Sequence, residues 1–261
     1  MNKTRRKLAL ATWTTPTEGN IFAKLTVDIE KALAWIEEKR EESGTKVTVT
    51  SLVGSVISRA LASAPGFNGY IRMGSYVPHD QVALSFLVVT DDGKDLAKVK
   101  ISEADTKSVV DIATELKSRA NRVREGKDEE FESSKNLLRI MPAFLIRPIL
   151  WLTGWLTSSL GISLKSAGLS AFPFGAAVIT SVGMFGVDEA FVPQTPFARV
   201  PLWVLIGSIK EVPAVVDGEI AIRRQLTITT TVDHRFVDGF EGARMMRLVR
   251  ELLEDPSKLE S

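Results

Sequence analysis

The chain has 261 residues, 44% of them hydrophobic and 25% charged, with a formal net charge of +1. This length can bury a substantial core, and a balance without basic excess gives no reason to expect a nucleic-acid partner. Cysteine is absent, which excludes disulfides, thiolate metal sites and a cysteine nucleophile. With only two histidines available, we also expect no metal cofactor. The first 16 residues lack a sustained apolar run, so we expect no signal peptide and a cytoplasmic protein.

Apolar spacing predicts one mixed α/β domain, because strand patterns with a period of two alternate with helical patterns. Thr48 or Thr50 is a candidate N-cap for the second helix. The expected elements, in chain order, are a strand at 21–29, helices at 29–43 and 52–64, strands at 82–90 and 96–101, a helix at 106–125, strands at 176–182, 202–209 and 219–232, and a helix at 240–254.

The segment 137–165 differs from the rest of the chain in its apolar character. It carries no charge between Arg147 and Lys165, and prolines and glycines interrupt it. This uncharged run is shorter than the roughly 20 residues of a membrane-spanning helix. We expect a packed helical insertion or a subunit contact. An interfacial membrane helix, a wall for a hydrophobic substrate and a true span stay open as alternatives.

The stretch from Thr229 to Pro256 carries the chemistry. A strand delivers His234 into the turn His-Arg-Phe-Val-Asp-Gly, and a helix follows Gly239. Imidazole is the side chain best suited to take a proton near neutral pH. One histidine beside an aspartate is, however, more often structural than catalytic. The other histidine, His79, follows a proline in a loop-like stretch, and we expect it to be an exposed surface residue.

The residues around His234 form a pattern that indicates a function for it. Asp233, His234, Arg235, Asp238 and Gly239 form an Asp-His-Arg-x-x-Asp-Gly motif. This motif resembles the C-terminal signature of the dihydrolipoyl acyltransferases, the catalytic cores of 2-oxoacid dehydrogenase complexes. Residues 179–187, Ile-Thr-Ser-Val-Gly-Met-Phe-Gly-Val, resemble a second family stretch, Ile-Ser-Asn-Leu-Gly-Met-Phe-Gly-Val. The resemblance implies a chloramphenicol acetyltransferase-like α/β fold, an α+β sandwich, over one domain at 1–261. An atypical hydrophobic insertion at about 132–172 interrupts it.

The resemblance implies acyl transfer between coenzyme A and a thiol acceptor such as dihydrolipoamide. His234 would act as the general base for the attacking thiol. Thr180 stands where the family has a serine that stabilises the oxyanion, and Ser181 follows it. Neighbouring strand residues point to opposite faces, so only one of them can donate to the oxyanion. We favour Thr180 and assign Ser181 to coenzyme A binding, while Ser181 as the donor stays open.

The other motif residues are expected to hold the active-site turn. The resemblance implies an ion pair for Asp238, and Arg5 or Arg6 is its candidate partner. Asp233 and Arg235 are expected to brace the same loop. We count Asp238 with the catalytic group because its ion pair would shape the turn that carries His234.

The resemblance also implies a homotrimer or a multiple of trimers, with His234 and Thr180 meeting from different chains. We expect no lipoyl domain in this chain, so a separate lipoyl-carrying protein would supply that group. Two alternatives remain open: a small-molecule O-acetyltransferase, and a catalytically silent trimeric scaffold or membrane-associated protein of the same fold. The second alternative includes peripheral membrane contact through 137–165. The sequence determines neither the acyl group nor the acceptor.

Overall fold

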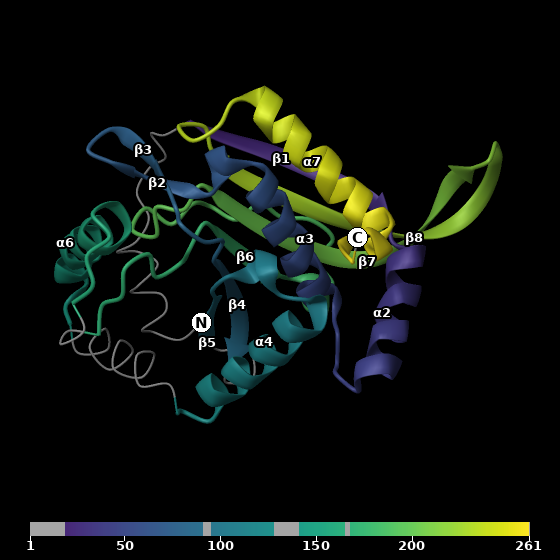
Figure 1. Ribbon diagram of the computed structural model, residues 1–261, viewed down its shortest axis with the longest axis horizontal. Coiled ribbons are helices and arrows are strands. Elements are labelled where there is room, and N and C mark those ends of the chain that lie inside the picture. Colours follow the sequence, from purple (N-terminus) through teal and green to yellow (C-terminus); the bar gives the residue numbers. More distant parts are fainter. Residues whose placement is uncertain (1–18, 91–94, 128–140, 165–167, 261) are drawn as a thin grey trace.

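A six-stranded mixed sheet forms the centre of the molecule (Figure 1). The structure is a computed structural model that describes residues 19–90, 95–127, 141–164 and 168–260. The strand order is β1-β8-β7-β6-β4-β5, and β6 runs parallel to both of its neighbours while the other pairs are antiparallel. The strands are β1 (Asn20–Asp28), β4 (Leu84–Thr90), β5 (Asp95–Ile101), β6 (Ala177–Ser181), β7 (Leu202–Val216) and β8 (Glu219–Asp233).

Four helices cover one face of this sheet (Figure 1). Their apolar sides and one face of the strands form a single buried cluster, as the amphipathic spacing requires. Leu84, Ile179, Val204 and Ile228 belong to this cluster and show that strands β4, β6, β7 and β8 all turn one face to the helices. The helices are α2 (Glu30–Ser43), α3 (Val49–Ser63), α4 (Val109–Arg124) and α7 (Gly239–Glu254).

Local capping explains where the first helices begin and end. The Thr48 side chain accepts a hydrogen bond from the Ser51 backbone, and the Ser51 side chain accepts one in return, which forms a capping box at the start of α3. Thr48 is therefore the N-cap, and Thr50 lies inside the helix. Gly44, with a φ of 65°, ends α2 in the left-handed conformation that glycine adopts without strain.

The opposite face of the sheet carries a second, smaller buried cluster. It contains Val178 of β6 and Trp203 of β7, packed with Ala198 and Val200 from the preceding loop. Because strand side chains alternate, Val178 faces this cluster while its neighbour Ile179 faces the helices. The two faces of β6 are thus assigned. The same alternation gives the side of the sheet that Thr180 faces and the side that Ser181 faces at the end of the strand.

A short ribbon of β2 (Gly69–Arg72) and β3 (Ser75–Pro78) was not among the expected elements. Each strand has four residues, which is too short for a clear alternating pattern. Its two-residue turn, Met73-Gly74, has positive φ angles of 49° and 80°, as a tight hairpin needs.

The β7–β8 hairpin extends well beyond the body of the molecule (Figure 1). Its turn lies at Asp217-Gly218, directly before the expected strand at 219–232, but β7 continues to Val216 rather than ending near residue 209. The far part of the ribbon packs against little, and Val215, Ile220 and Ile222 are each at least 75% exposed. An isolated ribbon of this kind is only marginally stable in water, which favours a partner for this part of the chain.

Within the segment 137–165, the described residues form a helix, α6 (Ala143–Gly154), which continues into a π-helical turn, η4 (Trp155–Ser159). Figure 1 shows α6 at the end of the molecule opposite the β7–β8 hairpin. No helix in the described part of the chain combines the length and apolar character needed to cross a membrane.

Candidate active site

The loop that carries His234 is held by an ion pair between its two neighbours. Asp233, at the end of β8, is 3% exposed, and the Arg235 guanidinium pairs with both of its carboxylate oxygens. The Nε–Oδ1 distance is 2.9 Å and the Nη2–Oδ2 distance is 2.5 Å. The backbone N–H of Arg235 also donates to Asp233 Oδ1 at 3.0 Å. The prediction that Asp233 and Arg235 brace this loop is confirmed.

The His234 ring is oriented by a hydrogen bond within its own loop. Nδ1 lies 2.7 Å from the carbonyl oxygen of Val237. A carbonyl can only accept, so Nδ1 donates, and in the neutral ring the lone pair lies on Nε2. The His234 backbone N–H donates to Gly19 across the end of β1. His234 is an exposed residue in the single chain, and no described residue makes a hydrogen bond to its Nε2.

Asp238 has a structural contact that the sequence alone did not reveal. Its side chain caps α7 by accepting hydrogen bonds from the backbone N–H groups of Phe240 at 2.9 Å and Glu241 at 3.0 Å. This cap fixes the junction where the His234 loop passes into the helix. Arg5 and Arg6 lie outside the described residues, so the ion pair of Asp238 stays a prediction.

The two candidate oxyanion donors lie at the end of β6, far from His234 in the same chain. Thr180 is opposite Leu205 of β7, and Leu205 is opposite Thr229 of β8. His234 follows Thr229 by five residues, on a strand that runs toward the other end of the sheet. At about 3.3 Å per residue and about 4.8 Å between strands, the separation is on the order of 20 Å. One chain therefore does not bring the base and the hydroxyl together.

Thr180 and Ser181 face opposite sides of the sheet. Thr180 shares its side with Val178, away from the helices, and Ser181 shares its side with Ile179, toward them. Both side chains are half-buried. The geometry supports the expectation that only one of them can face a given acyl group.

Beneath the His234 loop lies an apolar cavity of about 230 Å³ between β1, β8 and α7. Val237 and Asp238 of the loop form part of its rim, and α7 contributes Met245 and Met246. The cavity therefore reaches the segment that orients the imidazole, although no sequence pattern marked it.

His79 is not the exposed surface residue that the sequence predicted. Its ring is half-buried, with ring centroids 5.2 Å from Tyr70 and 4.6 Å from Phe172. Burial is the main cause that lowers the pKa of His79 to about 4, and the nearby Lys100 ammonium acts in the same direction. The prediction was wrong because Phe172 lies far along the chain, and only the folded structure brings it to this loop.

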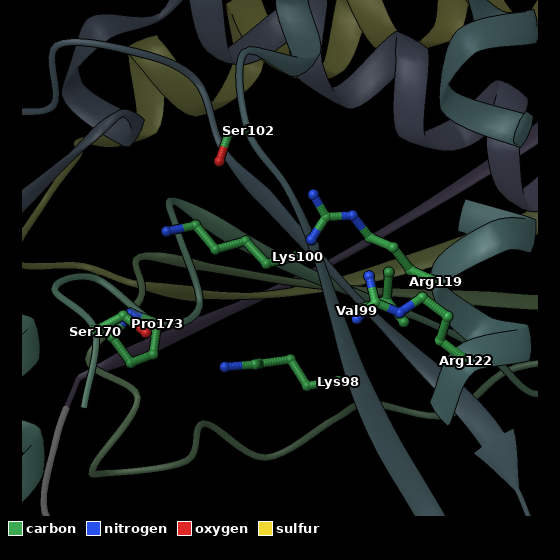
Figure 2. A pocket seen from close by; sticks show the side chains of 8 residues that line it. All are labelled: Lys98, Val99, Lys100, Ser102, Arg119, Arg122, Ser170 and Pro173. Carbon is green, nitrogen blue, oxygen red and sulfur yellow. The ribbon is translucent and has the colours of Figure 1, made fainter. Parts of the chain in front are cut away.

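The structure also gathers basic residues that are scattered in the sequence. A cavity of about 320 Å³ between β5, α4 and residues 170–173 is lined by four cationic side chains (Figure 2). The near-neutral net charge of the whole chain gave no sign of this local cluster. Some of this charge is compensated, because Arg119 pairs with Glu115 and Lys100 donates to the Phe172 carbonyl. The four residues are Lys98, Lys100, Arg119 and Arg122.

Among the described residues, no group of three or more histidine, aspartate or glutamate side chains could hold a metal ion.

Comparison with known sequences identifies the family. Residues 3–137 and 168–260 match the profile described as 2-oxoacid dehydrogenases acyltransferase (catalytic domain). The chain belongs to this family. The internal stretch that the profile does not match, 138–167, includes α6 and η4.

Two relatives are succinyltransferase components of 2-oxoglutarate dehydrogenase complexes. The mitochondrial protein of Saccharomyces cerevisiae is 26% identical over 250 residues, covering 92% of this chain and 44% of that protein. The Escherichia coli K12 protein is 27% identical over 255 residues, covering 97% of this chain and 51% of that protein. The chain thus spans about half the length of these relatives.

Solved structures confirm the predicted fold. A probable dihydrolipoamide acetyltransferase from Listeria monocytogenes matches with a TM-score of 0.69 at 18% identity, covering 97% of this chain and 92% of that one. The cubic core of a pyruvate dehydrogenase multienzyme complex gives 0.69 at 19% identity, with 98% and 89% covered. A chloramphenicol acetyltransferase gives 0.52 at 9% identity, with 97% and 96% covered.

Proposed function

We propose that this chain transfers an acyl group between coenzyme A and a thiol acceptor such as dihydrolipoamide, with His234 as the general base. The observation that carries the proposal is the hydrogen bond from His234 Nδ1 to the Val237 carbonyl. In the neutral ring, this bond places the lone pair on Nε2. That is the state in which an imidazole can take a proton from a thiol.

The proposed reaction follows from this state. Nε2 takes the proton of the attacking thiol, and the thiolate adds to the thioester carbonyl, whose electron pair moves to the oxygen. Collapse of this oxyanion breaks the original carbon–sulfur bond, and the departing thiolate recovers the proton from the imidazolium. Reference pKa values of about 8.5 for a thiol and about 6.5 for imidazole make both proton transfers accessible.

The oxyanion needs a donor, and Thr180 is the proposed one. Its own chain holds it on the order of 20 Å from His234, by the strand spacings given above. We therefore propose that a second copy of the chain supplies Thr180, in a homotrimer or a multiple of trimers. The exposed imidazole and the unsupported end of the β7–β8 hairpin favour such an assembly. A contact between copies would also remove water from the site, which strengthens oxyanion stabilisation.

The proposed acceptor class follows the relatives, which are described as acting on dihydrolipoyllysine residues. We propose that the dihydrolipoyl group reaches this site on a separate protein. Free dihydrolipoamide presents the same thiol and is the simplest probe of this step.

The experiment mixes two single variants, His234→Ala and Thr180→Ala, each expected to be nearly inactive alone with acyl-CoA and dihydrolipoamide. Co-expressed chains that assemble together would contain some sites with a native His234 from one copy and a native Thr180 from the other. Partial recovery of turnover is the expected result. Mixed assemblies, verified by two affinity tags, that stay inactive would contradict the shared site. Absence of turnover in the unchanged protein would instead favour the silent scaffold.

A further inference from the structure

The cavity between β5, α4 and residues 170–173 gathers positive charge that the proposed general-base step does not use (Figure 2). Its volume is about 320 Å³, and four of the eight residues that line it are lysine or arginine. No aspartate or glutamate is among the described residues that line it. A cleft lined by one sign of charge concentrates ions of the opposite sign, so this lining favours an anionic ligand.

The four cations come from two elements that are separate in the sequence. Lys98 and Lys100 are two residues apart on β5, so both side chains leave the strand on the same side. Arg119 and Arg122 are three residues apart on α4 and therefore share one face of the helix. Figure 2 shows the lysines extending toward the 170–173 segment and the arginines reaching from α4 toward β5. The fold thus directs all four side chains to one place.

Contacts within the fold position the two lysines. The Lys100 ammonium donates to the Phe172 carbonyl at 2.7 Å. The Lys98 ammonium lies 4.9 Å from the centre of the Phe174 ring. Both contacts join β5 to the segment that forms the opposite wall of the cavity, so this wall and the lysines are held together.

The two arginines differ in their contacts. Arg119 pairs with Glu115, and the Glu115 carboxylate also pairs with Lys107, so one negative charge serves two positive ones. The Arg122 guanidinium makes no hydrogen bond or ion pair within the described part of the chain, and the residue is exposed. Arg122 can therefore donate to a ligand without giving up a contact in the fold.

Phosphate groups match this set of donors better than a single carboxylate does. Guanidinium groups donate to phosphate oxygens in a two-pronged geometry, and ammonium groups bind phosphate as point charges. A carboxylate has one charge and two oxygens, whereas a diphosphate offers several of each. We propose that this cavity binds the phosphate groups of a phosphorylated organic ligand.

The strand register relates the cavity to the proposed acyl-transfer site. Lys98 is opposite Leu87 of β4, and Leu87 is opposite Thr180 of β6. Residues paired across strands share a face, so Lys98 and Thr180 both lie on the side away from the helices. Two strand spacings of about 4.8 Å put their Cα atoms about 10 Å apart. Coenzyme A carries its phosphates at the opposite end of a long arm from its thiol, so it is one source of this chemistry, and this assignment rests on the proposed function. A separate phosphorylated ligand is the other source.

The first test measures the binding of inorganic diphosphate to the full chain by isothermal titration calorimetry. We expect binding that weakens as salt is added, since salt screens the attraction. The double variant Lys98→Gln/Arg122→Gln should raise the Kd at least about tenfold, because two charge-assisted contacts are lost. Lys46→Gln/Lys117→Gln is the matched control, since it removes the same charge from exposed positions that do not line the cavity. It should keep the Kd of the unchanged chain.

A second titration separates the two sources of phosphate. Coenzyme A, ATP and pantetheine, the thiol arm without phosphates, are added to the same three proteins. Weaker binding of coenzyme A by the double variant, without a change for pantetheine, would assign the cavity to coenzyme A. The KM for acyl-CoA should then rise at least about tenfold with little change in kcat, as loss of uniform binding does. Weaker binding of ATP alone would assign the cavity to a separate phosphorylated ligand.

Equal affinities of the double variant and its control for every phosphate-bearing probe would overturn the proposal, as would no binding of any of these probes. Acyl transfer itself is checked with an acyl-pantetheine, which carries no phosphate. Absence of that turnover would contradict the proposed function, whereas diphosphate binding is measured without any acyl donor and does not depend on it.

Discussion

The chain has two histidines, and the fold gives them opposite environments. His234 is exposed at the end of β8, with Nδ1 fixed by the Val237 carbonyl and Nε2 left open. His79 is half-buried between Tyr70 and Phe172, and this burial lowers its pKa to about 4. One imidazole is thus oriented to exchange a proton with a ligand, and the other is kept neutral by its surroundings.

This difference shows that the reactivity of a histidine depends on the contacts of its ring. At His234 the ring contact is local, since Val237 is three residues away, and the Asp233–Arg235 pair that holds the loop flanks the histidine directly. At His79 the deciding contact, Phe172, is remote in sequence. A motif can therefore describe the first site, whereas the second depends on how distant segments pack.

The largest expected effect is on His234. His234→Ala should lower kcat for acyl transfer by about 10²–10⁴-fold, because the general base is lost. His79→Gln is the matched control and should leave kcat within about twofold, since that ring has no part in the proposed transfer. The comparison would fail if steady-state assays gave the two variants similar rates.

The next effect separates the two hydroxyls at the end of β6. Thr180→Ala should lower kcat by about 10²–10³-fold with little change in KM, as loss of one oxyanion donor does. Thr180→Ser keeps the hydroxyl and should retain most of the rate. Ser181→Ala serves as the paired variant, and a larger loss there would transfer the donor role to Ser181.

A smaller effect concerns stability and tests His79 directly. Because its folded pKa of about 4 lies below the ordinary value of 6.5, the unfolded chain binds more protons between these pH values. The free energy of unfolding should therefore fall as the pH falls through this window, by no more than about 3 kcal/mol. Urea denaturation at several pH values measures this slope. His79→Gln should flatten it, and an unchanged slope would show that other groups cause it.

The smallest effect concerns the cap that supports the His234 loop. Asp238→Ala should lower the free energy of unfolding by about 1 kcal/mol, because two backbone N–H groups of α7 lose their acceptor. Asp238→Asn keeps an acceptor oxygen and should retain most of that stability. If thermal denaturation shows equal losses for both variants, the charge of Asp238, and hence an ion pair, matters more than the cap.

The sequence predicted most of the large elements because their signals are local. The Thr48 cap, the Gly44 terminator and the strand leading to His234 all follow from neighbouring residues. It missed the β2–β3 ribbon, whose four-residue strands are too short to show a period, and the continuation of β7 to Val216. It also failed on the cluster of Lys98, Lys100, Arg119 and Arg122, because β5 and α4 are separate along the chain.

By itself the sequence determined the order of strands and helices, the family and the motif around His234, since each depends on residues close together in the chain. Only the tertiary structure decided that His79 is half-buried, that Thr180 lies far from His234 in one chain, and that α6 turns an apolar face outward. These features depend on strand register and on packing between distant segments. Such contacts form only when the whole chain buries its core.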